Sequence, residues 1–248
     1  MQNKLVNILK KYVFPAAFWL GIWQIASTAV NREFLLPGIP ATLNALADLL
    51  VDRGFYIAVA LSALRVALGL LLGIIFGIIL AFVCRKSDLL DSLFSPAIRV
   101  IKSTPVASFI LLLWVLMSGD ALSVFIGFLM VMPIIYQNVS QGISAIDPQL
   151  DEVCRVFRFS FSKRLRLLVL PTVKKYLYPA IITASGLAWK AEIAAEVIAY
   201  TKDSIGQGIN DAKYDLNTPT VFAWTLVIVL LSVLLEKCAR SLFSRRLR

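Results

Sequence analysis

The sequence predicts an all-α integral membrane protein with six transmembrane helices, and two observations support this fold class. Hydrophobic residues make up 59% of the 248 residues and charged residues 16%, with a mean hydropathy of +0.80. This is more apolar surface than the single core of a soluble domain needs, so part of it must face lipid. In addition, uncharged stretches of about 20 residues, the length that crosses a bilayer as a helix, recur along the chain.

Six spans are predicted, followed here in chain order. They cover residues 12–30, 57–84, 96–118, 121–141, 172–200 and 217–236. The third and fourth contain Pro105 and Pro133, which are either gate or pathway positions or plain packing kinks. The fifth is interrupted by charged residues. All six are expected to form a single transmembrane domain, residues 1–248.

The first stretch has an alternative interpretation as a cleaved signal peptide. Lys4, Lys10 and Lys11 precede it and small residues follow it, as in such peptides. Its apolar run is longer than a signal peptide needs, and it contains Trp19 and Trp23. We therefore expect a membrane helix.

The distribution of Lys and Arg predicts the orientation of the chain. With six spans, both termini share a side, and that side would carry three basic residues before the first span, two at 85–86, seven at 155–175 and five at 237–248. The other side would carry four: Arg32, Arg53, Lys202 and Lys213. Basic loops stay in the cytoplasm, so both termini are expected there. This asymmetry accounts for most of the net charge of +10 without a nucleic-acid partner.

Several chemistries are excluded by composition. There is no histidine, and the three cysteines form no CxxC pair. A histidine-based catalytic triad and a histidine metal site are therefore ruled out, and a structural zinc site is not expected. No catalytic residue, metal ligand or cofactor-binding residue is predicted.

Small residues mark one face of the predicted second span. Gly69, Gly73, Gly77 and Ala81 recur every fourth residue, so they share a helix face where another helix can approach closely. Before this span, residues 40–51 have a helical apolar pattern. They form either a surface helix or the first turns of a longer second span.

The segment 147–171 between the fourth and fifth spans is predicted to be two short helices. Asp147-Pro148 is a helix start, and Ser160 or Ser162 can cap the second helix, which is expected to end at Pro171. Leu150, Val153 and Phe157 share one face. An apolar stripe of this kind needs a partner, either lipid headgroups or a groove in another protein.

Among the ionisable residues within the predicted spans are Arg65, Lys190, Glu192 and Glu196. Such residues are costly there and are candidates for translocation or gating. Glu192 and Glu196 are four residues apart and share a face, so they repel each other unless a cation or outer water meets them. Arg65 matches them in depth, whereas Lys190 lies on a different face. The glutamates would form an inter-helix ion pair near an outer gate or contact substrate directly.

One motif in the segment 147–171 resembles a known family. Glu152-Val153-Cys154 is followed by Arg158 and, nine residues later, by Leu168-Val169-Leu170-Pro171. This spacing resembles the Glu-Ala-Ala loop of binding-protein-dependent ABC importer permeases, with Val153 and Cys154 at the alanines and Arg158 at the glycine that allows the bend. Residues 36–40, 62–66, 186–190 and 205–209 are similar to the nitrate/sulfonate/taurine-type branch of that family.

The resemblance implies a type I ABC importer transmembrane domain with a cytoplasmic coupling helix. It implies a multi-pass protein of the bacterial cytoplasmic (inner) membrane, forming the pathway for a small solute. Its partners would be ABC ATPase subunits that hold ATP-Mg, an extracytoplasmic substrate-binding protein, the lipid membrane and a second permease copy in a homodimer. The residues implied to contact the ATPase are Asp151, Glu152, Val153, Cys154, Arg155, Arg158, Leu168, Leu170 and Pro171.

Two other classes of function remain as alternatives. A stand-alone secondary transporter would be expected to show an internal repeat or a cluster of carboxylates at the midplane, and neither is found. A membrane enzyme lacks support in the absence of a metal-ligand cluster or paired acids other than Glu192 and Glu196. The chain also lacks a G-x-x-x-x-G-K-[ST] motif, so ATP hydrolysis would take place on a separate subunit. The sequence leaves the identity and charge of the solute open.

Overall fold

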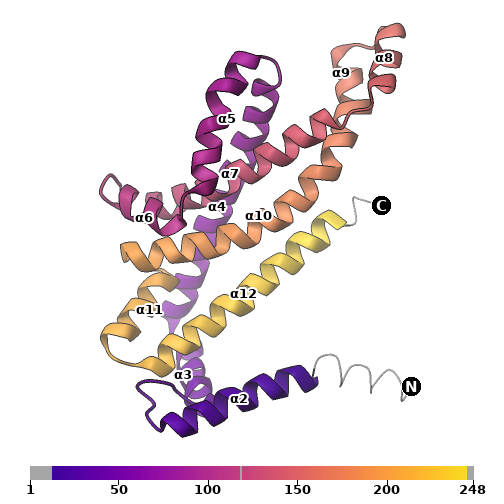
Figure 1. The fold of residues 1–248 in the computed structure, drawn as a ribbon. Coiled ribbons are helices and arrows are strands. Elements are labelled where there is room, and N and C mark those ends of the chain that lie inside the picture. Colours follow the sequence, from indigo (N-terminus) through magenta and orange to yellow (C-terminus); the bar gives the residue numbers. More distant parts are fainter. Residues whose placement is uncertain (1–12, 118, 245–248) are drawn as a thin grey trace, which may run out of the picture.

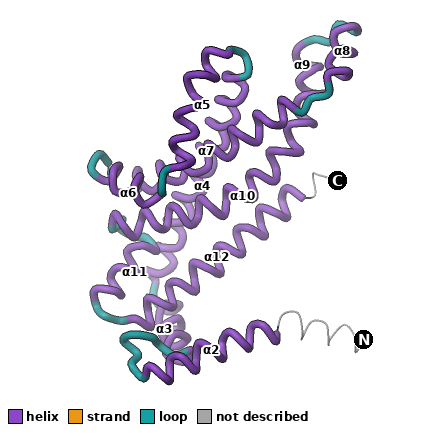
Figure 2. The backbone as a smooth tube through the Cα atoms, in the orientation of Figure 1, coloured by secondary structure: helices purple, strands orange, loops and turns teal. Residues whose placement is uncertain are grey.

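The computed structural model describes residues 13–117 and 119–244, and the regular structure in these ranges is helical throughout (Figure 2). The basic residues at positions 4, 10, 11, 245, 246 and 248 lie outside these ranges. The helices are α2 (Phe14–Val30), α3 (Ile39–Val51), α4 (Arg53–Cys84), α5 (Asp88–Ser103), α6 (Val106–Trp114), α7 (Asp120–Ser144), α8 (Pro148–Val156), α9 (Phe161–Arg164), the π-helical turn η2 (Leu165–Val169), α10 (Leu170–Ala199), α11 (Ile205–Tyr214) and α12 (Thr218–Ser244).

The core is built around α7, which packs against both α4 and α10. The predicted small-residue face of α4 is confirmed, because Gly69, Gly73, Gly77 and Ala81 are all buried. A Cβ atom added at Gly73 would lie 2.5 Å from the Cβ of Val131 on α7. The two backbones are therefore too close for a larger residue at Gly73, as expected where membrane helices associate through packing.

In the part of the chain that the structure describes, three helices have the length and apolar composition to cross a membrane. They are Arg53–Cys84, Asp120–Ser144 and the part of α12 from 218 to 241. The bent pair α5 and α6 would make a fourth crossing. Helix α2 is a shorter apolar helix of 17 residues, and α10, with 30 residues, is not among these three helices. The first and fifth predicted spans therefore remain predictions.

The third predicted span, residues 96–118, bends sharply at Pro105, one of the two prolines expected to interrupt a span. The chain turns by 102° between α5 and α6, at Thr104 and Pro105. A proline disfavours the helical conformation of the residue before it, and Thr104 is extended, with φ −80° and ψ 133°. Pro133, by contrast, lies buried inside α7, which continues through it as one α-helix.

Residues 39–51 form a separate helix, α3, which settles the two alternatives left open by the sequence. Asp52 is extended, and its side chain accepts a hydrogen bond from the backbone N–H of Gly54, so it caps the N-terminus of α4. In Figure 1, α8 and α9 project at one end of the bundle, while α3 and α11 lie toward the opposite end. We call these the α8–α9 end and the α3–α11 end.

Candidate functional site

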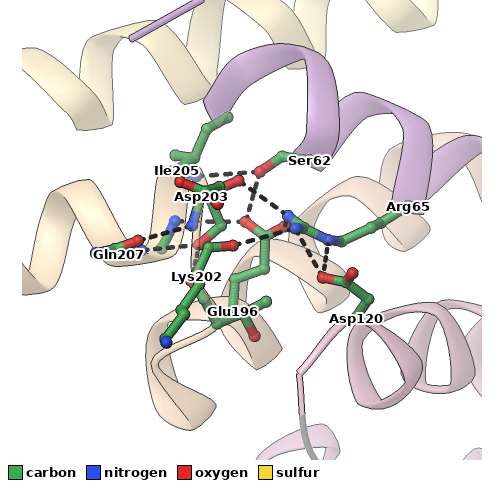
Figure 3. A network of polar contacts seen from close by, with 11 residues as sticks. Ser62, Arg65, Asp120, Glu196, Lys202, Asp203, Ile205 and Gln207 are labelled. Atoms are coloured by element: carbon green, nitrogen blue, oxygen red, sulfur yellow. Dashed lines mark hydrogen bonds and ion pairs between the residues drawn. The ribbon is translucent and has the colours of Figure 1, made fainter. Parts of the chain in front are cut away.

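A buried arginine organises the polar contacts at the α3–α11 end (Figure 3). Arg65 on α4 is 5% exposed, and its Nη1 donates to Oε1 of Glu196 on α10 at 3.0 Å. Its Nε and Nη2 contact Oδ1 of Asp120, the first residue of α7, at 2.8 and 2.7 Å. The guanidinium also donates to the backbone carbonyls of Lys202 at 3.1 Å and Asp203 at 3.4 Å. The planar, multidentate geometry of arginine is what allows one side chain to join three segments.

The second oxygen of Glu196 continues this cluster. Oε2 accepts from the Ser62 hydroxyl at 2.7 Å and from the backbone N–H of Gly206 at 3.4 Å. The Ser62 hydroxyl in turn accepts from the backbone N–H of Ile205, the first residue of α11, at 3.0 Å. A carboxylate near a helix N-terminus is favoured by the helix dipole. We call Ser62, Arg65, Asp120 and Glu196, with the backbone of 202–206, the Arg65 network.

The ion pair predicted between Arg65 and Glu196 is thus confirmed, but the prediction that Glu192 also meets a cation or outer water is wrong. Glu192 is fully buried, and among the described residues neither of its carboxylate oxygens has a hydrogen-bond partner. The Arg65 guanidinium is already occupied by Glu196, Asp120 and carbonyl groups. The Glu192 carboxyl instead lies over Gly69 of α4 and Gly127 of α7, where an added Cβ atom would overlap it.

The other membrane-depth candidates do not join the Arg65 network. Lys190 is exposed, and Pro105 and Pro133 lie at a helix break and inside α7. Sequence reasoning missed Asp120, which lies between two uncharged runs. Its place directly before the second run, where a carboxylate suits a helix N-terminus, was the available signal.

The second candidate site is the segment 147–164 at the α8–α9 end, called here the α8–α9 segment. Both predicted helix starts are confirmed: the Asp147 side chain accepts from the Gln149 N–H at 2.8 Å, and the Ser160 hydroxyl accepts from the Lys163 N–H at 3.4 Å. Cys154 is buried, whereas the predicted apolar stripe is exposed to solvent. Its members are Leu150, Val153 and Phe157, with Val156 and Phe161 exposed beside them.

Arg158 forms the bend between α8 and α9. Its φ of +49° is left-handed. The Arg158 N–H donates to the Arg155 carbonyl at 3.0 Å, and the Phe159 N–H donates to the Cys154 carbonyl at 2.9 Å. These two bonds are the Schellman pattern that ends a helix, which usually has glycine at the left-handed position. The bend implied by the family resemblance is therefore present, although arginine occupies the glycine position.

Glycine at this position is expected to stabilise the bend, and valine to destabilise it. The left-handed conformation costs a non-glycine residue about 1–2 kcal/mol, and a β-branched residue is the least tolerant of it. Arg158→Gly should therefore slow amide hydrogen exchange at positions 158 and 159. Where the greater conformational freedom of glycine in the unfolded chain offsets the relief of strain, the exchange rate should stay unchanged. Arg158→Val should accelerate it several-fold. Equal protection in the two variants would contradict the strain that we assign to Arg158.

Two ion pairs tie the α8–α9 segment together. The Asp151 carboxylate contacts Arg164 on α9 at 2.6 Å and Arg155, one turn along α8, at 3.1 Å. The hydrogen bond from Arg164 is the main reason that the pKa of Asp151 lies below its usual value. Because the folded pKa is lowered, the stabilisation is present at neutral pH and is lost only as the pH falls through that lowered value.

The predicted end of the second helix at Pro171 is wrong. The chain passes from α9 through the π-helical turn η2 directly into α10. Pro171 lies in the first positions of α10, where its missing N–H costs little after a π turn. Leu168 is buried, so it does not form part of the exposed stripe.

The structure resembles solved membrane transporters in fold. The "inward facing conformations of the MetNI methionine ABC transporter" match with a TM-score of 0.63 at 17% identity, over 81% of this chain and 96% of that chain. At this identity the likeness shows the fold alone, an all-helical bundle shared with a transporter subunit. The model of the family described as "binding-protein-dependent transport system inner membrane component" matches residues 73–248, and the chain belongs to this family.

Sequence relatives agree with this assignment. The chain is 28% identical over 222 residues to the nitrate import permease protein NrtB of Synechococcus elongatus, over 86% of this chain and 79% of the relative. It is 24% identical over 249 residues to the putative aliphatic sulfonates transport permease protein SsuC of Bacillus subtilis, over 99% of this chain and 89% of the relative. The protein is an inner membrane permease component of ABC import, and subunits of this family are not enzymes. No group of metal-ligating side chains occurs among the residues that the structure describes.

Proposed function

We propose that the α8–α9 segment is the coupling helix on which a separate ATPase subunit acts. The observation that supports this most is the exposed apolar stripe of Leu150, Val153 and Phe157 on a segment held rigid by two caps and two ion pairs. An exposed apolar helix face of this kind fits a groove in a protein partner.

The position of the segment also supports this role. It follows the end of α7 and leads through η2 into α10 without a break. These two helices pack against each other in the core, so a displacement of the segment is transmitted to both. Binding of ATP-Mg on the partner ATPase would then shift the bundle between two states, a coupling of two separate sites. The transporter would need no nucleotide or other cofactor on this chain.

We further propose six membrane crossings, with α2, the bent pair α5–α6 and α10 adding to α4, α7 and α12. Both termini and the α8–α9 end would then face the cytoplasm, in keeping with the basic residues there. The substrate-binding protein would dock at the α3–α11 end. The pathway would form with a second copy of this chain, because α4 and α12 present long apolar faces that the single bundle leaves exposed.

The Arg65 network would brace the extracytoplasmic end of this pathway. It ties α4, α7 and α10 to the start of α11, so these elements must move together or the network must open. Lys190, Glu192, Pro105 and Pro133 remain translocation or gating candidates on the same proposal. The names of the two relatives mention nitrate and aliphatic sulfonates, which favours a small oxyanion as the solute of this chain.

Reversal of one charge on the α8–α9 segment tests whether this segment binds the ATPase. Glu152 is exposed on α8, and Glu152→Lys is expected to reduce the amount of ATPase that co-purifies with the permease at least tenfold, because a like-charge contact in an interface costs several kcal/mol. ATP-driven uptake should fall in parallel.

The matched control is Asp215→Lys, which reverses an exposed acidic residue at the other end of the molecule. It should retain the ATPase fully. Unchanged ATPase retention and uptake in Glu152→Lys would show that the docking surface lies elsewhere. A permease that transports without any ATPase would favour the stand-alone carrier.

A further inference from the structure

A cavity of about 420 Å³ separates the α8–α9 segment from the ends of the core helices. Its walls come from the last residues of α4 and α7 on one side and from α8, α9 and η2 on the other. The volume lies in the range of pockets that hold small ligands, about 300–1,000 Å³. Neither the coupling role of the exposed stripe nor the Arg65 network accounts for this space.

The cavity carries an excess of positive charge. Arg85, Lys86 and Arg164 line it, with Asp151 as its acidic residue. Asp151 is already engaged by Arg164 and Arg155. Arg85 and Lys86 follow the end of α4, and in the described part of the chain no side-chain hydrogen bond or ion pair involves either of them. The cavity therefore presents two cations without an ion-pair partner among the described residues, and Arg85 also lines a smaller neighbouring pocket that contains Asp88 and Asp91.

Apart from Ser144, the remaining lining is apolar. Phe82, Ile146 and Val169 are among the residues that form it. The cavity also lies where α4, one of the helices long and apolar enough to cross a membrane, ends at Cys84. If the uncharged end of α4 marks the edge of the hydrocarbon layer, the cavity would lie at the level of lipid headgroups, with cations available for a phosphate and apolar side chains available for the first carbons of an acyl chain. Basic pockets between membrane helices at this level suit anionic lipid headgroups.

We propose that this cavity binds one anionic phospholipid, with its phosphate at Arg85 and Lys86. The bound lipid contacts both the core helices and the α8–α9 segment, so it holds the α8–α9 segment in place against the bundle. This site goes beyond the coupling role proposed above and requires only that α4 and α7 cross the membrane.

The test measures retention of phosphatidylglycerol by the full-length chain in mixed micelles with phosphatidylcholine, read by native mass spectrometry. Arg85→Gln/Lys86→Gln is expected to lower phosphatidylglycerol retention about tenfold, since each surface cation contributes severalfold to the attraction of anionic lipid. The matched control, Lys174→Gln/Lys175→Gln, removes two adjacent exposed cations from the start of α10 and is expected to change retention less than twofold.

Three results would overturn the proposal. The first is an equal loss in both double variants, which would indicate general surface attraction. The second is equal retention of phosphatidylglycerol and phosphatidylcholine by the wild type. The third is full displacement of the lipid by millimolar inorganic phosphate, which would make the site one for a free anion. None of these readouts uses the ATPase or the solute, so a failure here is distinct from a failure of the coupling proposal.

Discussion

Replacement of Arg65 by methionine is expected to lower the free energy of unfolding by about 3–5 kcal/mol, because it leaves the buried Glu196 carboxylate without its cation. Glu196 is 1% exposed, so water cannot take over the lost contacts. The substitution also removes the donors to the carbonyls of Lys202 and Asp203, which hold the chain entering α11. Unfolding of the purified chain in mixed micelles, titrated with denaturing detergent, measures the loss.

Two further variants separate the buried part of the network from its exposed part. The Asp120 side chain is 74% exposed, so Asp120→Asn should cost less than about 1 kcal/mol although Asp120 contacts the same guanidinium. The double variant Arg65→Met/Glu196→Met should recover much of the loss, because it no longer leaves the Glu196 carboxylate buried without its cation. An Arg65→Met chain as stable as the wild type would show that the network does not stabilise the bundle.

The difference between Glu192 and Glu196 shows how far sequence reasoning reaches at this site. Helical spacing placed the two on one face, and depth paired that face with Arg65. Spacing could not show that one guanidinium would be fully used by Glu196, Asp120 and two carbonyls. In the loop before α11, the groups that accept hydrogen bonds from Arg65 are backbone carbonyls, which the side-chain types in the sequence cannot predict.

The same contrast holds for the helices. Asp147-Pro148 and Ser160 have side chains that cap locally, so the starts of α8 and α9 could be predicted from the residues themselves. Two prolines behaved differently. Pro105 ends a helix and allows a 102° turn, whereas Pro171 lies at the start of α10 and interrupts nothing. The outcome depends on whether the preceding residues are already helical and packed, which is a property of the tertiary structure.

Alanine at Gly127 is expected to cost about 1–3 kcal/mol of stability, the usual penalty for overpacking a close contact. The Cβ atom would overlap the Glu192 carboxyl, and Glu192 has little room to move because Gly69 of α4 confines it from the other side. Gly186→Ala is the matched control. It is also a helical glycine, but an added Cβ meets nothing within 4 Å there, so the variant should be neutral or stabilising by up to about 1 kcal/mol.

The cause of the Gly127→Ala effect can be isolated with Glu192→Ala. That substitution removes the carboxyl that the new Cβ would strike, and it also removes a buried polar group that has no partner among the described residues. The double variant should therefore be more stable than the sum of the single effects predicts, by about 1–3 kcal/mol in a double-mutant cycle. If the effects of Gly127→Ala and Glu192→Ala simply add, Gly127 is required for the close packing of α7 against α4 and not for the space that it leaves to the Glu192 side chain. In that case the buried glutamate would be free to rearrange within the bundle.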